Sequence, residues 1–139
     1  MGARRKARIL AFQSLFCHEI SSGKALDTLC FPWLEDERRA RMGEDTLAFA
    51  QLLVQGTLEH LQDVDIAIKK HLEHWDFGRL NKVDQAILRI SAYCLLYQPS
   101  IPASVTIDEA IDIAKEYGTD DSYRFINGVL DGIRKEHAP

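Results

Sequence analysis

Proline and tight-turn sequences are scarce in this chain of 139 residues. The four prolines are Pro32, Pro99, Pro102 and Pro139, so none interrupts residues 34–98. No Asn-Gly or Asp-Gly pair joins two stretches of alternating hydrophobicity, and apolar residues recur at intervals of three and four. Strands need alternation and turns, whereas this spacing is typical of helices. The sequence therefore predicts an all-α fold.

Cysteine and long apolar runs are also scarce. Cys17, Cys30 and Cys94 are odd in number, far apart and without a Cys-X-X-Cys motif, so we expect buried free thiols in a reducing compartment. No apolar run reaches the ~18 residues that a membrane-spanning helix needs. The start of the chain lacks the small-residue cleavage site of a secretory signal. These absences predict a cytoplasmic protein.

Signatures of catalysis and cofactor binding are missing too. Residues 21–24, Ser-Ser-Gly-Lys, resemble the end of a phosphate-binding loop, but the earlier glycine is absent and Ala25 replaces the required Ser or Thr. His71 and His74 lie three residues apart, yet no third metal ligand follows at a suitable spacing. We expect no enzyme active site, no metal and no cofactor.

The charge is unevenly distributed. The formal net charge of −4 argues against a nucleic-acid-binding protein when taken as a total. Residues 1–18, however, contain four basic residues and no acid, which leaves 13 basic and 21 acidic residues for the rest of the chain. A short basic segment on an acidic body is the first feature that points to a polyanionic partner.

The chain has the length of one domain, residues 1–139, and enough residues for its own core. The apolar spacing predicts helices over residues 4–20, 24–29, 45–71, 82–97, 103–117 and 121–135, and an irregular connection over residues 30–43. We expect the long segment 45–71 to break near Asp63 or Asp65, either of which is a good N-cap. Apolar residues surround the helix 82–97, which predicts that it lies at the centre of the domain.

Two helices carry features that suit single-stranded nucleic acid. Arg5, Ile9, Phe12 and Phe16 share one sector of the first helix, with Arg8 beside it. Cations bind phosphates and rings stack on unpaired bases. The structural alternatives are a core position for the rings and a frayed, solvated terminus for the cations.

In the last helix, Phe125 points away from the apolar face, beside Arg124 and one turn before Gly128. This arrangement suits base stacking with close approach of the backbone. Packing of Phe125 against a neighbouring loop remains the alternative.

Several segments resemble the NusB family of bacterial transcription antitermination factors. They are Arg-Arg-Lys-Ala-Arg at residues 4–8, Ala-Phe-Gln-Ser-Leu-Phe at 11–16, Asp-Gln-Ala-Ile-Leu-Arg-Ile at 84–90, Ile-Pro at 101–102, Ile-Asp-Glu-Ala at 107–110, Ala-Lys at 114–115 and Ser-Tyr-Arg-Phe-Ile-Asn-Gly-Val-Leu at 122–130. Each match is weak alone, but their order and spacing resemble the family pattern.

The resemblance implies about seven helices in two packed sub-bundles and no enzymatic activity. It implies binding of boxA, a single-stranded element of nascent RNA, together with the ribosomal protein NusE. It further implies action on the RNA polymerase elongation complex with other Nus factors, chiefly in ribosomal RNA operons. A homodimer is also compatible with the resemblance.

The resemblance also implies site residues. For RNA it points to Arg4, Arg5, Lys6, Arg8, Phe16, Arg124, Phe125, Asn127 and Gly128, and for NusE to Asp84 and Asp121. Three positions depart from the family pattern, namely Lys6, His74 and Asp108. The lysine loses the bidentate geometry that arginine offers to phosphate, but it keeps the charge.

Two functions other than RNA binding by an antitermination factor are conceivable for such a helical domain. A helical adaptor that binds only proteins, through the acidic residues of helix 103–117 and the start of the last helix, would not need the basic segment. A similar domain precedes the catalytic domain of some RNA cytosine methyltransferases, and we expect no such role because the sequence to Pro139 leaves no room for a methyl-donor fold.

Overall fold

The computed structural model describes residues 2–21, 34–72 and 76–137, and in these ranges it contains seven α-helices and no strand. The helices are α1 (Ala3–Ser21), α3 (Asp36–Met42), α4 (Glu44–Glu59), α5 (Leu61–Lys70), α6 (Lys82–Tyr97), α7 (Ala103–Tyr117) and α8 (Ser122–Glu136). A short 3-10 turn, η1 (Phe77–Arg79), precedes α6. The all-α prediction is confirmed.

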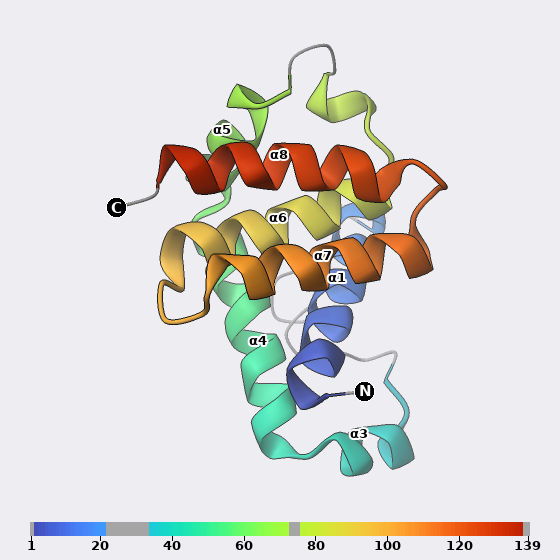
Figure 1. Cartoon of the computed structure of the whole chain (residues 1–139). Helices are drawn as coiled ribbons and strands as arrows, with labels where there is room; N and C mark the ends of the chain where they lie inside the picture. The colour runs from blue at the N-terminus through green and yellow to red at the C-terminus, as the bar shows by residue number, and fades with distance from the viewer. Residues whose placement is uncertain (1, 22–33, 73–75, 138–139) are drawn as a thin grey trace.

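Helix α6 lies between two groups of helices. It packs against α1, α4 and α5 on one side and against α7 and α8 on the other. Figure 1 shows α7 and α8 running side by side, with α1 and α4 forming the other group. Ten residues of α6 are buried, from Asp84 to Cys94 with the exception of Arg89. The central position predicted for this helix is therefore confirmed.

The start of α6 follows from its sequence. Asn81 has extended backbone angles, and its side-chain oxygen accepts a hydrogen bond of 2.8 Å from the backbone N–H of Asp84. The amide of Asn81 donates in return to Oδ2 of Asp84 at 3.1 Å. This reciprocal pair satisfies one of the backbone donors that a helix start leaves unpaired. It also fixes the side chain of Asp84 in the first turn of the central helix.

The break in the long segment 45–71 is confirmed, but its predicted place is wrong. Helix α4 ends at Glu59 and α5 begins at Leu61, with His60 between them. Asp63 and Asp65 lie inside α5 instead of capping it. Asp65 accepts hydrogen bonds from Arg89 of α6, and Asp63 accepts one from the hydroxyl of Tyr97. Tertiary partners on α6 thus replace the capping role that local sequence predicted.

The irregular connection predicted for residues 30–43 is wrong where the structure describes it. Residues 36–42 form α3, with Asp36 and Glu37 in the first turn and Arg39 and Arg41 in the last. Charges in this order compensate the helix dipole. Gly43 separates α3 from α4 and has a φ of 86°, a value that residues with a side chain rarely adopt. The helix expected at 24–29 lies outside the described residues.

The core confirms part of the thiol prediction. Cys94 is buried and its pKa rises to about 11 because burial disfavours the thiolate. Cys17 is exposed, contrary to expectation, and Cys30 lies outside the described residues. In the described ranges, no helix is long and apolar enough to cross a membrane.

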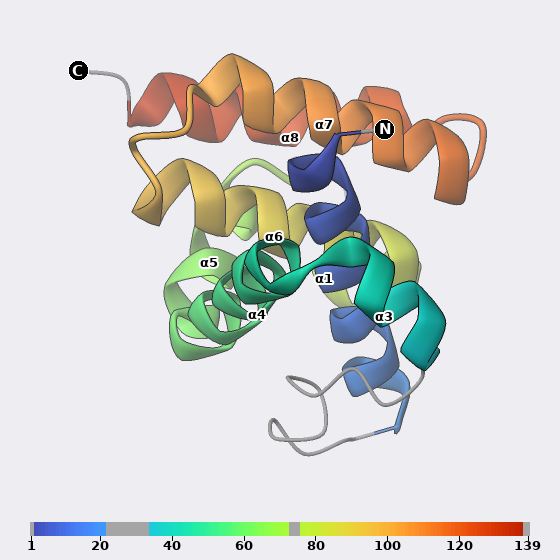
Figure 2. The same cartoon turned by 90° about the horizontal axis from the view of Figure 1, so that it is seen from below.

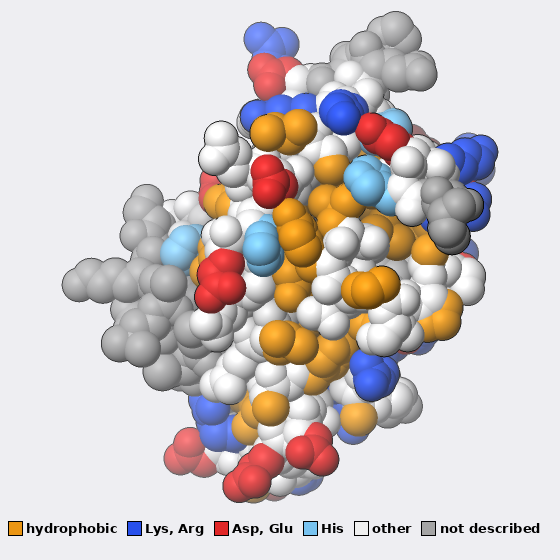
Figure 3. All heavy atoms as spheres, turned by 90° about the vertical axis from the view of Figure 1, so that its left-hand side faces the viewer, with side chains coloured by type: hydrophobic (Ala, Val, Ile, Leu, Met, Phe, Trp, Pro, Cys, Tyr) orange, Lys and Arg blue, Asp and Glu red, His pale blue; other side chains and the backbone are white. Residues whose placement is uncertain are grey.

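The face at the left of Figure 1 is mainly apolar at its middle. Figure 3 shows hydrophobic side chains gathered there, with Lys and Arg side chains toward the edges. Leu52 of α4 and Ile66 of α5 are among the exposed large hydrophobic residues of the protein.

Candidate nucleic-acid interface

The four basic residues of α1 do not share one environment. Arg4 and Lys6 are exposed, Arg5 is partly exposed, and Arg8 is only 4% exposed. The guanidinium of Arg4 lies 4.9 Å from the ring centre of Phe49 on α4, a cation–π distance. Of the four, Arg4 and Lys6 therefore have the most accessible charges.

Arg5 is held by two carboxylates of α7. Its Nε lies 2.6 Å from Oε2 of Glu109, and its Nη2 lies 2.6 Å from Oδ2 of Asp112. The hydrogen bond that Arg5 donates to Glu109, opposed by partial burial and aided by the charges of both carboxylates, raises the pKa of Arg5 above its ordinary value. Arg5 joins α1 to α7, and a phosphate must compete with both acids for it.

Arg8 lies inside the domain. Its Nη1 is 3.7 Å from Oε1 of Glu109, and its guanidinium lies 5.7 Å from the ring centre of Phe49. Among the described residues, none of its three side-chain nitrogens has a hydrogen-bond partner. Because the side chain is buried, direct RNA contact by Arg8 stays an untested prediction that this burial disfavours. Its visible role is to bring a charge beside Glu109.

The aromatic residues of α1 belong mainly to the core. Phe12 is 4% exposed and packs against Tyr117 of α7, with ring centres 5.1 Å apart. Ile9 is buried as well, so the sector shared by Arg5, Ile9, Phe12 and Phe16 faces the interior at its centre. Of the two alternatives that the sequence left open, Phe12 therefore takes the core position. Phe16 is half-buried and packs against the core.

The first two turns of α8 carry the second group of predicted residues. Arg124 is exposed, and its Nε donates a hydrogen bond of 3.0 Å to the hydroxyl of Tyr123. Lys115 of α7 lies 5.0 Å from the centre of the same ring. Phe125 is half-buried, whereas Asn127 and Gly128 are exposed. A Cβ added at Gly128 would meet nothing within 4 Å, so the backbone there is open to a ligand.

A hollow of about 530 Å³ lies between the starts of α6 and α8. Its lining combines apolar, acidic and basic side chains: Arg79, Leu80, Asn81, Asp84, Thr119, Asp121, Ser122, Arg124 and Phe125. We call it the Phe125 hollow. It brings together residues predicted for RNA (Arg124 and Phe125) with those predicted for the protein partner (Asp84 and Asp121).

Asp84 lies buried at the wall of the Phe125 hollow. Its Oδ2 accepts hydrogen bonds from the hydroxyl of Ser122 and the amide of Asn81, each at 3.1 Å. Within the described ranges, its Oδ1 has no hydrogen-bond partner. Burial raises the pKa of Asp84, and the hydrogen bonds from Ser122 and Asn81 oppose the shift. Because Oδ1 is also shielded from solvent, a ligand in the hollow does not reach it in this arrangement.

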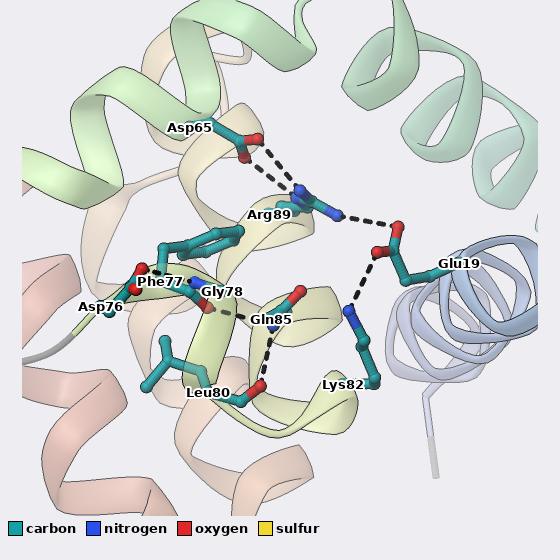
Figure 4. A network of polar contacts seen from close by, with 9 residues as sticks. All are labelled: Glu19, Asp65, Asp76, Phe77, Gly78, Leu80, Lys82, Gln85 and Arg89. Carbon is teal, nitrogen blue, oxygen red and sulfur yellow. Dashed lines mark hydrogen bonds and ion pairs between the residues drawn. The ribbon is translucent and has the colours of Figure 1, made fainter.

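A polar network holds residues 77–81, which contribute to the lining of this hollow, against α6. Gln85 donates from Nε2 to the backbone oxygens of Phe77 and Leu80, at 3.1 and 2.8 Å. Arg89 makes a bidentate pair with Asp65 at 2.9 and 3.0 Å and lies 4.9 Å from the ring centre of Phe77. Figure 4 shows these residues converging from α5, η1 and α6, with Glu19 of α1 joining Lys82 and Arg89.

The network positions part of the lining of the Phe125 hollow. Residues 77–81 have few backbone bonds of their own, so Gln85 and Arg89 hold them against α6. Leu80 and Asn81 are thereby placed in the lining of the Phe125 hollow. A preformed hollow of this kind binds its ligand without first ordering a loop, which saves conformational entropy.

Sequence reasoning missed Arg79, Tyr123 and Lys115. Tyr123 adjoins the predicted residue Arg124 in the sequence, but its contact with Lys115 joins α7 to α8 and depends on tertiary structure. The metal hypothesis for His71 and His74 lies partly outside the described residues. His71 lies near the other end of α8, where its Nε2 is 2.9 Å from Oε2 of Glu136.

Known proteins resemble this chain over nearly its whole length. The family model described as NusB family matches residues 5–135. The transcription antitermination protein NusB of Treponema pallidum (strain Nichols) is 55% identical over 133 residues, which cover 95% of this chain and 92% of the relative.

Solved structures are similar as well. A structure of T. maritima NusB has 40% identity and a TM-score of 0.85, and the match covers 98% of this chain and 93% of the other. A structure of antitermination factors NusB and NusE in complex with double-stranded RNA has 26% identity and a TM-score of 0.85, with 97% and 98% covered.

Proposed function

Because this chain belongs to the NusB family of transcription antitermination proteins, we propose that it binds boxA-type single-stranded nascent RNA together with NusE. In this proposal the pair acts in the cytoplasm on the RNA polymerase elongation complex with other Nus factors. Its effect is read-through of terminators, chiefly in ribosomal RNA operons. The protein contributes binding surfaces and no catalytic step.

The observation that carries the proposal is the Phe125 hollow. Phe125 and Leu80 supply apolar surface, Arg124 supplies a cation, and the exposed residues Asn81 and Thr119 supply polar groups. An unstacked base needs a surface to stack on and a partner for its polar edge, and the adjoining phosphate needs a cation. These three requirements are met within one hollow of about 530 Å³.

The accessible cations set the expected salt dependence. Arg4, Lys6 and Arg124 are exposed, whereas Arg5 is held by two acids and Arg8 is buried. Three phosphate contacts on a single strand correspond to a slope of about −2 in log affinity against log salt, or roughly 20-fold weaker binding from 50 to 200 mM. Affinity of this protein alone is therefore expected to be modest and salt-sensitive.

The partner role rests on the acidic residues beside the same hollow. Asp121 is exposed at the start of α8, and Asp84 lines the same hollow from the first turn of α6. Ribosomal proteins are generally basic, and complementary charge speeds their association with an acidic surface. A protein docked at this edge would complete the binding site for the RNA, which explains why the pair is proposed to act together.

A gel-shift titration with and without NusE tests the proposal, using a boxA strand and a scrambled strand of equal composition. We expect preference for boxA, increased by NusE. Phe125→Ala should weaken boxA binding by about 1–3 kcal/mol because a stacking ring is lost. Tyr97→Ala is the matched control, since Tyr97 stacks on His60 at the other end of α6.

Two outcomes would contradict the proposal. Equal binding of both strands, with and without NusE, would remove the sequence-specific RNA role and favour an adaptor that binds proteins only. Unchanged boxA affinity in Phe125→Ala would assign that ring to packing.

A further inference from the structure

A second hollow lies between α1 and α3 and is lined mainly by cations. Its volume is about 260 Å³, and its lining residues are Lys6, Arg38, Arg41 and Met42. The three basic residues are exposed and Met42 is half-buried. Figure 2 shows α3 beside α1 on the side of the molecule seen from below. We call this feature the α3 basic hollow.

The cations of the α3 basic hollow are not neutralised within the described parts of the chain. No ion pair there includes Lys6, Arg38 or Arg41, although Glu37 precedes Arg41 by four residues on the same helix. Arg5 provides the contrast, because it is held by both Glu109 and Asp112.

Three like charges around one hollow repel one another, and a bound anion removes that cost. The position of Arg41 in the last turn of α3 suits the helix dipole, but the dipole does not explain why Lys6 and Arg38 converge on the same place. Two guanidinium groups and one ammonium group form a typical phosphate-binding set. Arginine offers bidentate hydrogen bonds and lysine a point charge.

The α3 basic hollow lies near the end of α7 that leads to the Phe125 hollow. Burial raises the pKa of the Tyr117 hydroxyl, and the nearby charge of Arg38 opposes that shift. Tyr117 is the last residue of α7, and it is 37% exposed. Thr119, two residues later, lines the Phe125 hollow. The end of α7 thus has Arg38 of the α3 basic hollow near Tyr117, and Thr119 of the Phe125 hollow two residues farther along the chain.

We propose that Lys6, Arg38 and Arg41 bind a backbone phosphate of the RNA outside the part of the strand held in the Phe125 hollow. This inference rests on the proposed function, since it extends the path of the same RNA from α8 past the end of α7 to α3. The contact is independent of base identity. It adds affinity and salt dependence to binding without adding sequence preference.

The test compares Arg38→Gln/Arg41→Gln with wild type, using boxA alone and boxA extended on both sides. Each lost phosphate contact weakens single-strand binding about fivefold at 0.1 M salt and reduces the salt slope by ~0.7. Because the site holds one phosphate, we expect about fivefold weaker binding of the extended strand, a salt slope smaller by about 0.7, and an unchanged ratio of boxA to scrambled affinity.

The control is Arg134→Gln/Lys135→Gln, which removes the same charge from exposed positions near the end of α8. Thermal unfolding by circular dichroism establishes that both double variants are folded. Weaker binding of boxA alone would also support the site and would place its phosphate within boxA.

Two results would overturn the proposal, and they are distinguishable. If wild type prefers boxA but Arg38→Gln/Arg41→Gln binds the extended strand with wild-type affinity and slope, the α3 basic hollow is not an RNA site and the proposed function stands. If wild type binds neither strand in the presence of NusE, both proposals are wrong.

Discussion

Asp112→Asn is expected to strengthen RNA binding by releasing Arg5. The Oδ2 of Asp112 lies 2.6 Å from Nη2 of Arg5, and both side chains are at the surface, with exposed fractions of 46% and 36%. A phosphate that takes Nη2 must first displace this carboxylate. The variant removes that competition and leaves the second carboxylate, Glu109, on Nε.

The magnitude follows from the exposure of the pair. Exposed ion pairs contribute about 0.2–1 kcal/mol to stability. Displacing Asp112 from Arg5 therefore reduces the binding free energy of a phosphate by no more than that amount. Removing the carboxylate should therefore tighten RNA binding by up to about fivefold. One additional phosphate contact would steepen the salt slope by at most ~0.7. Unfolding free energy should fall by less than about 1 kcal/mol.

Glu109 is a poor target for the same experiment because it also faces Arg8 at 3.7 Å. Its removal would leave a buried guanidinium without a counter-charge, which destabilises the fold. Asp108→Asn is the better control, since it removes the same charge from an exposed position of α7.

The assay is fluorescence anisotropy with labelled boxA at several salt concentrations. Tighter binding in Asp112→Asn but not in Asp108→Asn supports competition for Arg5. Weaker binding in Asp112→Asn would refute it, because the carboxylate would then be holding Arg5 in its binding position.

Three further variants separate folding from binding. Gly128→Ala should raise helix stability by up to about 1 kcal/mol, since the added methyl group has open space, and denaturant titration measures this gain. The same methyl group should weaken RNA binding, measured by anisotropy, because it covers the backbone that is open to a ligand. Asp84→Asn should raise the melting temperature at pH 7, because burial raises the pKa of Asp84 and so disfavours its ionised form; the gain should disappear below the pKa of an unfolded aspartate, and an equal difference at all pH values would contradict it. Gly56→Ala should lower stability by about 1–3 kcal/mol because its Cβ would overlap the Tyr93 ring, and an unchanged melting temperature would show that α4 and α6 separate easily.

Local features of the sequence predict much of the fold. The side chain of Asn81 caps the backbone N–H of Asp84 and also bonds its carboxylate, which needs only residues three apart, and α6 begins there as expected. The all-round apolar pattern of residues 83–96 correctly predicts the central helix, because such a surface must be covered from every side. The helix over residues 36–42 was missed because its charges outnumber its apolar residues.

The environments of the basic residues depend on contacts that sequence spacing does not reveal. Arg5 pairs with Glu109 and Asp112, which lie 104 and 107 positions away. The burial of Arg8 has a local signal, since Arg8 precedes Phe12 by one helical turn and a core position for Phe12 is one of the two alternatives that the sequence allows. Convergence of Lys6 with Arg38 and Arg41 left none, because it requires the packing of α3 against α1.

Photo-cross-linking locates the RNA most directly. Thiouridine placed at single positions of boxA, irradiated in the presence of the protein and NusE, can be mapped by mass spectrometry of the cross-linked peptides. We predict cross-links in the first two turns of α1 and of α8, including peptides that contain Phe125. Cross-links confined to α4 and α5, on the apolar face of Figure 3, would contradict the account.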